Sequence, residues 1–99
     1  MKKATQEQID GWKAKYPNAD IWQITVEDKV AYLRSPDRKT LSMASTVGAQ
    51  DPMKFNEILL KNCWLDGDLE IQTNDTLFLS ASSKLAQLIE IKETEMVKL

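Results

Sequence analysis

Few side chains in this sequence have the chemistry that catalysis requires. The chain contains no histidine, which is the commonest general base and metal ligand and the usual partner of a serine or cysteine nucleophile. Its one cysteine, Cys63, comes late in a predicted helix beside Trp64, away from the helix N-terminus that would stabilise a thiolate. Because free cysteine is usually buried, we expect Cys63 to pack in the core as an inert thiol. We therefore predict a protein that is not an enzyme, has no catalytic residue and needs no small-molecule substrate.

A short acidic run offers carboxylate oxygens of the kind that coordinate a hard cation. Asp66, Asp68 and Glu70 alternate with Gly67 and Leu69. A calcium loop needs acidic or amide residues at three alternating positions, a following glycine and a distant glutamate, and the run matches this pattern only in part. A solvated turn after a helix is the favoured interpretation, and we predict no metal site.

Phosphate groups and nucleic acids also lack an obvious binding site. The three glycines are far apart and none belongs to a GxGxxG or GxxxxGK motif, so we predict no nucleotide cofactor. The 13 lysine and arginine residues are outnumbered by 15 aspartate and glutamate residues, which gives a net charge of −2. A chain with this balance lacks the basic surface that binds a phosphate backbone, so no nucleic-acid partner is expected.

One basic cluster remains as a candidate contact site. Arg34, Arg38 and Lys39 bracket Pro36 and could hold an anionic partner. The alternative is a solvated charged face, which is what isolated basic clusters usually form.

The composition is that of an ordinary folded domain. A chain of 99 residues with 42% hydrophobic residues fits a single domain, residues 1–99, with one core. No apolar run approaches the roughly 20 residues needed to cross a bilayer, so no membrane partner is expected. The two lysines after Met1 are followed by polar residues rather than by the apolar run of a secretion signal, so we expect a cytoplasmic protein.

The first third of the chain predicts a helix and a β-hairpin. Thr5 and Gln8 have the spacing of a capping box, and apolar residues then recur at helical spacing up to Pro17, which predicts a helix over residues 6–16. From residue 21 the apolar period changes to two, as in a half-buried strand. A polar tip at residues 27–29 then predicts a hairpin over residues 21–34.

Three further helices are predicted. Ser35-Pro36 and Asp51-Pro52 each combine an N-cap residue with proline at the first helical position, which predicts helices over residues 36–47 and 52–62. Gly48 is a residue that can end the first of them in the left-handed conformation. Residues 64–68 break the second helix, and residues 69–71 are expected to be a short extended piece.

The last predicted helix is the longest and covers residues 76–97, with Asn74 in the capping segment before it. Its apolar face consists of Leu77, Phe78, Ala81, Leu85, Leu88, Ile89 and Met96. We expect it to pack as far as about Ile89 and to project beyond that point. The predicted class is therefore α+β: an N-terminal helix, a two-stranded antiparallel hairpin and three helices, of which the last is long.

The three tryptophans have two possible roles. Trp12, Trp22 and Trp64 could anchor a partner, because tryptophan is enriched at interface hot spots. They could equally supply buried area to the core of a small domain.

Three stretches of the chain resemble the small tail-assembly chaperones of long-tailed bacteriophages and prophages, most of all those of phages of gut Bacteroidetes. They are Ile-Thr-Val at 24–26 with Tyr-Leu-Arg-Ser-Pro-Asp-Arg-Lys at 32–39, Phe-Asn-Glu-Ile-Leu-Leu-Lys-Asn-Cys-Trp-Leu at 55–65 with its acidic loop, and residues 85–99. The likeness covers most of the chain from about residue 20 onward.

The resemblance implies a binding function in the host bacterial cytoplasm. Proteins of this family are not catalysts; they are thought to coat the long helical tape-measure protein, keep it soluble and help to recruit tail-tube subunits. Amphipathic helices can bind such a client without any titrating side chain. Because the client is long, many copies of the protein would be needed, so self-association is also expected.

Several residues are candidates for contact with the partner. They are Arg34 and Pro36 with Arg38 in the proline turn, Trp64 and Leu65 after the helix predicted over residues 52–62, and Leu88 and Met96 on the last predicted helix. Two other functions remain open: a structural component of the phage tail or head–tail junction, and a small enzyme or ligand-binding regulator. The last would need a closed pocket with convergent polar groups.

Overall fold

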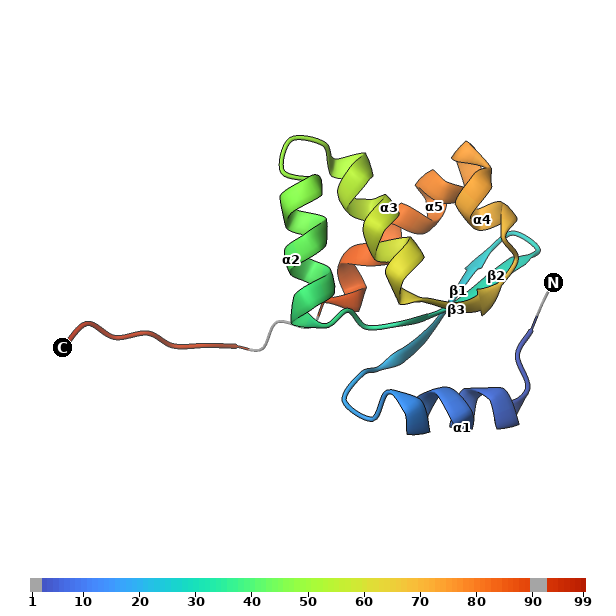
Figure 1. Ribbon diagram of the computed structural model, residues 1–99, viewed down its shortest axis with the longest axis horizontal. Helices are drawn as coiled ribbons and strands as arrows, with labels where there is room; N and C mark the ends of the chain where they lie inside the picture. The colour runs from blue at the N-terminus through green and yellow to red at the C-terminus, as the bar shows by residue number, and fades with distance from the viewer. Residues whose placement is uncertain (1–2, 90–92) are drawn as a thin grey trace.

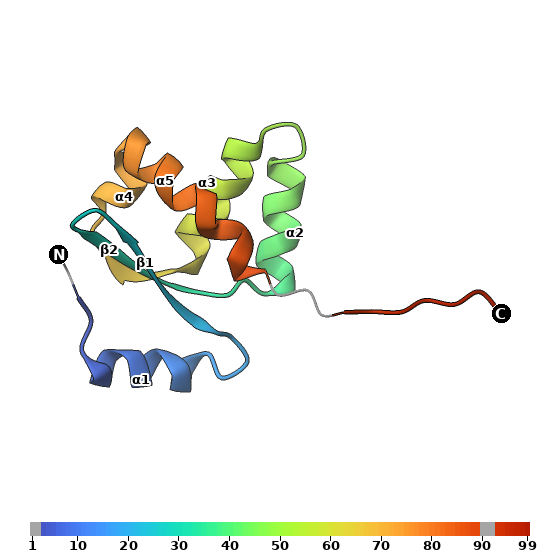
Figure 2. The ribbon, with the colours of Figure 1, turned by 180° about the vertical axis from the view of Figure 1, so that it is seen from behind.

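A three-stranded sheet separates one helix from the others in the computed structural model, which describes residues 3–89 and 93–99. The elements in chain order are α1 Gln6–Lys15, β1 Ile21–Val26, β2 Lys29–Arg34, α2 Arg38–Val47, α3 Pro52–Cys63, β3 Trp64–Gly67, α4 Glu70–Thr73, α5 Asp75–Leu85 and the 3-10 helix η1 Ala86–Leu88. Helices α2 to α5 gather on one side of the sheet and α1 lies alone on the other (Figures 1 and 2). The predicted α+β class is confirmed.

The predicted hairpin forms the first two strands of the sheet. β1 and β2 are antiparallel, with a register that runs from Ile21 opposite Arg34 to Val26 opposite Lys29. Glu27, at the tip, has φ 54, a conformation that costs a residue with a side chain roughly 1–2 kcal/mol. The tip therefore forms without the Asn-Gly or Asp-Gly pair that usually favours such a turn.

The core lies between the sheet and the helices α2 to α5. Ile24, Ala31 and Leu33 supply the sheet side of the core. The helical side consists of Ala44, Leu59, Leu60, Cys63, Ile71, Ala81, Leu85 and Leu88. These positions recur every three or four residues along α3 and α5, as expected for helices with one buried face.

The helix starts confirm two sequence predictions and correct a third. In α1 the Thr5 hydroxyl accepts from the Gln8 N–H at 3.2 Å, while the Gln8 side chain accepts from the Thr5 N–H at 2.9 Å, which completes the predicted capping box. Asp51 caps α3, and Pro52 is its first residue, as predicted. The start of α2 is different, because its N-cap is Asp37 and its first residue is Arg38.

Ser35 does not cap α2 because it still belongs to the open end of the hairpin. Its N–H donates to the Asp20 carbonyl at 2.9 Å, and its hydroxyl accepts from the Asp20 N–H at 2.9 Å. The Asp37 carboxylate instead accepts from the Thr40 N–H at 2.8 Å. The prediction of a helix from residue 36 was therefore two residues early at its start.

The segment after α3 contains a strand that the sequence did not predict. Trp64–Gly67 pairs antiparallel with β2 and forms the third strand, although its Asp and Gly residues are typical of a turn. Residues 69–71 were predicted to be extended, but Glu70–Thr73 forms the short helix α4. Ile71 is buried in that turn of helix, and this burial offsets the weak helix propensity of a four-residue segment.

The last helix is much shorter than predicted. α5 ends at Leu85 and is continued only by η1 to Leu88, and residues 93–99 are not helical. The expectation that packing stops near Ile89 is confirmed, because Leu88 is buried and Ile89 is packed against the core. Residues 93–99 are all exposed, so no packing against the core stabilises a helix there, and a short isolated helix is marginal in water. Residues 90–92, which the predicted helix also included, lie outside the described residues.

Candidate partner-binding surface

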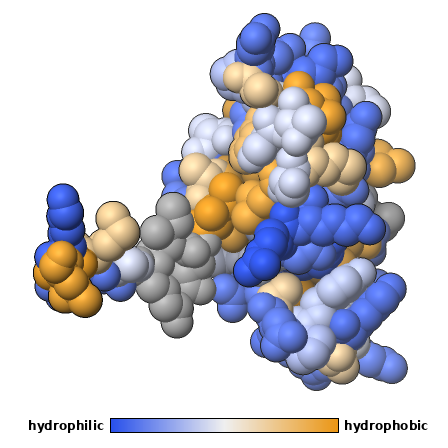
Figure 3. Space-filling view, turned by 60° about the vertical axis from the view of Figure 1, so that its left-hand side comes forward, coloured by the Kyte–Doolittle hydropathy of each residue, from blue (hydrophilic) through white to orange (hydrophobic). Residues whose placement is uncertain are grey.

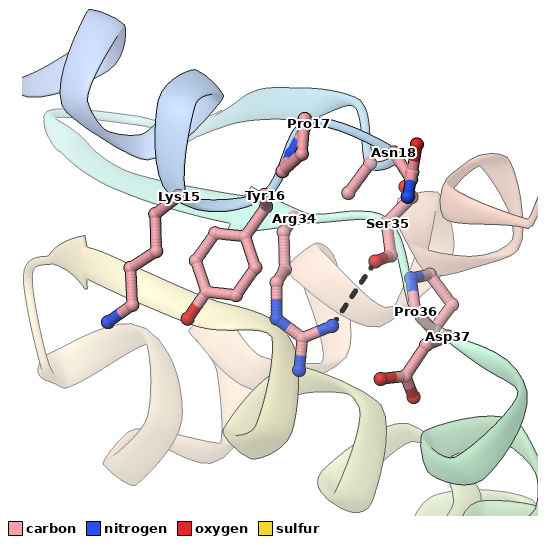
Figure 4. A pocket seen from close by; sticks show the side chains of 9 residues that line it. Lys15, Tyr16, Pro17, Asn18, Arg34, Ser35, Pro36 and Asp37 are labelled. Atoms are coloured by element: carbon pink, nitrogen blue, oxygen red, sulfur yellow. Dashed lines mark hydrogen bonds between the residues drawn. The ribbon is translucent and has the colours of Figure 1, made fainter.

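The proline turn forms one wall of a shallow hollow of about 280 Å³ between the end of α1 and the start of α2 (Figure 4). Its lining comprises Lys15, Tyr16, Pro17, Asn18, Ala19, Arg34, Ser35, Pro36 and Asp37. The sequence predictions Arg34 and Pro36 are therefore placed together, and both are half-buried. Arg38 is exposed on the first turn of α2 and does not line the hollow.

Arg34 makes several contacts within the domain. One guanidinium nitrogen donates to the Asn62 carbonyl in the last turn of α3 at 3.1 Å, and another donates to the Ser35 carbonyl at 3.4 Å. The guanidinium also stacks over the Tyr16 ring at 5.1 Å, and Lys15 approaches that ring at 5.5 Å (Figure 4). A cation near the last carbonyls of a helix is favourable, so Arg34 joins the hairpin to α3 and to the end of α1.

A backbone hydrogen bond favours the ionised form of Asp37 at the start of α2. The Thr40 N–H holds the pKa of Asp37 below its usual value, and the nearby positive charges of Arg34 and Lys39 act in the same direction. An ionised Asp37 partly balances the cations of the hollow, which leaves little excess positive charge for an anionic partner.

The predicted Trp64 and Leu65 site lies at the junction of α3 and β3. Both side chains are half-buried, and Trp64 packs against the core opposite Leu33 of β2. Cys63, just before them, is fully buried, and burial raises the pKa of its thiol to about 11. The prediction that Cys63 is buried is confirmed, and a thiol with a raised pKa is mainly protonated at neutral pH.

The acidic run makes hydrogen bonds to the backbone. The Asp68 carboxylate accepts from the Val30 N–H at 2.9 Å, and the Asp68 N–H donates to the Val30 carbonyl at 2.8 Å. The Asp66 carboxylate accepts from the Gly67 N–H at 2.9 Å. The two bonds between Asp68 and Val30 extend the pairing of β3 with β2, whereas the Asp66 bond lies within β3. Within residues 3–89 and 93–99, no group of three acidic or cysteine residues is placed to hold a metal ion.

The two candidates from the last predicted helix are far from equivalent. Leu88 is buried in the core with 3% of its side chain exposed, so it offers little surface to a partner. Met96 is 96% exposed in the segment that leaves the domain beside α2 (Figure 1). The two residues do not share a helix face, because the helix ends between them.

The tryptophans divide between packing and exposure. Trp12 stacks on Tyr32 with ring centroids 5.4 Å apart and is half-buried, whereas Trp22 on β1 is 39% exposed. None of the three is fully buried, so these side chains contribute less to the core than an aromatic residue in a small domain usually does.

Sequence reasoning did not single out three exposed apolar side chains on α2 and α3. Met43 and Val47 lie one turn apart on α2 and are 42% and 55% exposed, and Met53 at the start of α3 is 46% exposed. We call these three residues the helical-hairpin surface. Figure 3, which brings the α2 side of the molecule forward, shows apolar side chains among the polar ones on this face. Helical spacing alone could not identify them as exposed, because apolar residues beside a buried face follow nearly the same periodicity as residues within it.

No protein-family model, curated protein or solved structure gives a significant match to this chain. None of the helices in the described part of the chain has the length and apolar character of a bilayer-spanning segment.

Proposed function

We propose that this domain is a non-enzymatic tail-assembly chaperone of a phage or prophage, which binds apolar helical segments of the tape-measure protein and aids tail-tube recruitment. The proposal joins the sequence resemblance to one observation. Every methionine within residues 3–89 and 93–99 is substantially exposed: Met43, Met53 and Met96.

Exposed methionine is suited to binding clients of variable sequence. The unbranched, polarisable side chain adapts to irregular apolar surfaces and is over-represented where a protein binds many different helices. A tape-measure protein presents such a series of differing helical segments. Met43 and Val47, one turn apart on α2, would provide adjacent contacts along one helix face.

The apolar helical-hairpin surface also lies on a rigid support. α2 and α3 are joined by a short connection in which the Gly48 N–H donates to the Ala44 carbonyl at 2.8 Å and the Asp51 N–H donates to the Gly48 carbonyl at 3.2 Å. A surface on two packed helices needs little ordering on binding, so less of the interaction free energy is lost to conformational entropy.

Co-expression with the tape-measure protein of the same gene cluster tests the proposal. The wild-type domain should raise the soluble fraction of the tape-measure protein and co-purify with it. The double variant Met43→Asp/Val47→Asp should lose both effects, because two carboxylates would have to be buried against an apolar client.

The matched control is Ser42→Asp/Ser45→Asp, which adds the same charge at exposed positions of the same helix. It should behave like the wild type. Equal solubility of the client with and without the domain, and no co-purification, would contradict the proposal. Recovery of the protein from mature particles at a fixed copy number would favour the structural tail component instead.

A further inference from the structure

The two edge strands of the sheet differ in how they are protected against pairing with another chain. β3 has four residues, includes an aspartate and has a register irregularity opposite β2, all of which discourage pairing at its edge. β1 has six residues, Ile-Trp-Gln-Ile-Thr-Val, with no charge and no proline, and its register with β2 is regular throughout. An unprotected edge of this length is a ready template for another strand.

The outward backbone groups of β1 can be identified from the register. The Ser35 N–H donates to the Asp20 carbonyl, which is one of the two bonds of a hydrogen-bonded pair at the position just before Ile21 and Arg34 in the register. In an antiparallel ladder such pairs alternate along the strands. The N–H and C=O groups of Ile21, Gln23 and Thr25 therefore point away from β2. Gln23 and Thr25 are exposed, and β1 is an outer strand of the sheet, so no strand of the described residues pairs with this edge.

Shallow hollows lie along this edge. One of about 300 Å³ is lined by Trp22, Gln23, Ile24 and Thr25 with Lys84, Gln87 and Leu88. Another of about 630 Å³ adjoins the first residues of β1 and is lined by Lys13, Pro17, Ala19, Asp20, Ile21 and Trp22. The edge thus has space on its α5 side and near α1 for the side chains of an added strand.

The C-terminal segment has the features of that strand. Residues 93–99 run away from the domain as an outstretched chain (Figures 1 and 2). At about 3.3 Å per residue they span roughly 23 Å, and β1 spans roughly 20 Å. Val97 and Leu99 alternate with polar Lys98, and both apolar side chains are exposed.

We propose that residues 93–99 of one copy pair as an antiparallel strand with the β1 edge of a second copy. The second copy is the occupant because the segment points away from the β1 edge of its own domain (Figure 1). Each copy carries one such segment and one open edge, so exchange closes a dimer if it is reciprocal and builds a chain if it is not.

One register satisfies both the apolar and the charged side chains. With Leu99 opposite Trp22 and Val97 opposite Ile24, both apolar residues enter the hollow on the α5 side. Glu95 then points to the same side, where Lys84 lines the hollow. In this register Met96 lies opposite Thr25 and exchanges backbone hydrogen bonds with it. A parallel arrangement would place the glutamates near Trp22 and lose the match to Lys84.

A disulfide cross-link between two single variants tests this register. Thr25→Cys protein mixed with Met96→Cys protein and oxidised with copper phenanthroline should give a disulfide-linked heterodimer in high yield. A Glu7→Cys and Met96→Cys mixture, with cysteine at an exposed α1 position, is the control for random collision and should give little. Equal yields in both mixtures, or an internal disulfide in a monomeric Thr25→Cys/Met96→Cys double variant, would overturn the proposal.

Sedimentation of the purified full chain supplies the second test. The mean mass of the wild type should rise with concentration. Met96→Pro removes the N–H that bonds to Thr25 and should keep the protein monomeric, whereas Met96→Ala keeps the N–H and should still associate. A wild type that stays monomeric up to millimolar concentration would contradict strand exchange. Because no client is present, this result would leave the chaperone proposal unaffected.

Discussion

At the scale of single residues, burial determines the pKa of the Cys63 thiol and its expected reactivity. The side chain is fully buried, and burial raises its pKa from about 9 to about 11. We predict that Cys63 reacts with a thiol reagent such as DTNB far more slowly in the native protein than in urea at pH 8. A native rate close to the denatured rate would show that the end of α3 is open to solvent.

Glycine has different roles at its different positions, which a pair of substitutions can separate. Gly67 has φ +142, and a Cβ there would lie 2.4 Å from the Val30 carbonyl oxygen. Gly67→Ala should lower the free energy of unfolding by more than about 1 kcal/mol, because both the backbone conformation and the space are lost. Gly11 lies in α1 with no atom within 4 Å of an added Cβ.

Gly11→Ala is therefore the matched control for Gly67→Ala. It should be neutral or stabilising by up to about 1 kcal/mol, since alanine has the higher helix propensity. Urea denaturation of both variants measures the difference. A Gly67→Ala variant as stable as the wild type would mean that β3 does not approach β2 as closely as described.

At the scale of elements, the start of α2 depends on an ionised cap. The pKa of Asp37 is lowered in the folded state, chiefly because its carboxylate accepts the Thr40 N–H. The stabilisation is therefore present above the usual pKa of 3.8 and is lost as the pH falls through the lower folded-state value. Asp37→Ala should cost about 1 kcal/mol near pH 7 and progressively less in acid.

The appropriate control is Asp37→Asn, which keeps a capping oxygen but cannot titrate. The free energy of unfolding of Asp37→Asn relative to Asp37→Ala should not change between pH 7 and pH 3. The free energy of unfolding of the wild type relative to Asp37→Ala should fall over the same range. Thermal unfolding monitored by circular dichroism at several pH values measures this. A difference in free energy of unfolding between the wild type and Asp37→Asn that stays constant over the whole pH range would show that ionisation of Asp37 does not stabilise the protein.

Helix α1 is held to the sheet by few interactions. It buries no residue, and its contacts include the Trp12 ring on Tyr32 and a 3.0 Å hydrogen bond from the Ala4 N–H to the Tyr32 hydroxyl. Trp12→Ala should therefore speed amide exchange in α1 and leave exchange in α3 and α5 nearly unchanged. Hydrogen exchange with mass spectrometry measures both regions, and equal acceleration throughout would mean that α1 is part of the cooperative core.

At the scale of the whole molecule, the sequence predicted those elements whose formation depends on interactions between residues close together in the chain. The capping box at Thr5, the Asp51-Pro52 helix start and the period-two run of β1 all act within a few residues, so the helices and hairpin could be expected. β3 could not, because a four-residue strand with Asp and Gly forms only when β2 is already beside it. The end of α5 was missed because it depends on where the core surface ends.

The candidate partner-binding residues were predicted less well than the fold. Arg34 and Pro36 line the same hollow, but the sequence could not show that the guanidinium already bonds to the end of α3. Leu88 was assigned to a surface because apolar periodicity does not separate a residue that faces the core from one that faces a partner. Exposure of Met43 and Val47 depends on how α2 packs, which is a property of the tertiary structure.

The central claim is that the protein holds an apolar client through the helical-hairpin surface, and methionine footprinting of the complex with the tape-measure protein tests it most directly. Peroxide converts exposed methionine to the sulfoxide. In the free protein Met43 and Met53 should both oxidise readily, and in the complex both should be protected severalfold, with the wild-type fold retained by circular dichroism. A stable complex in which Met43 and Met53 oxidise at the free-protein rate would contradict this account.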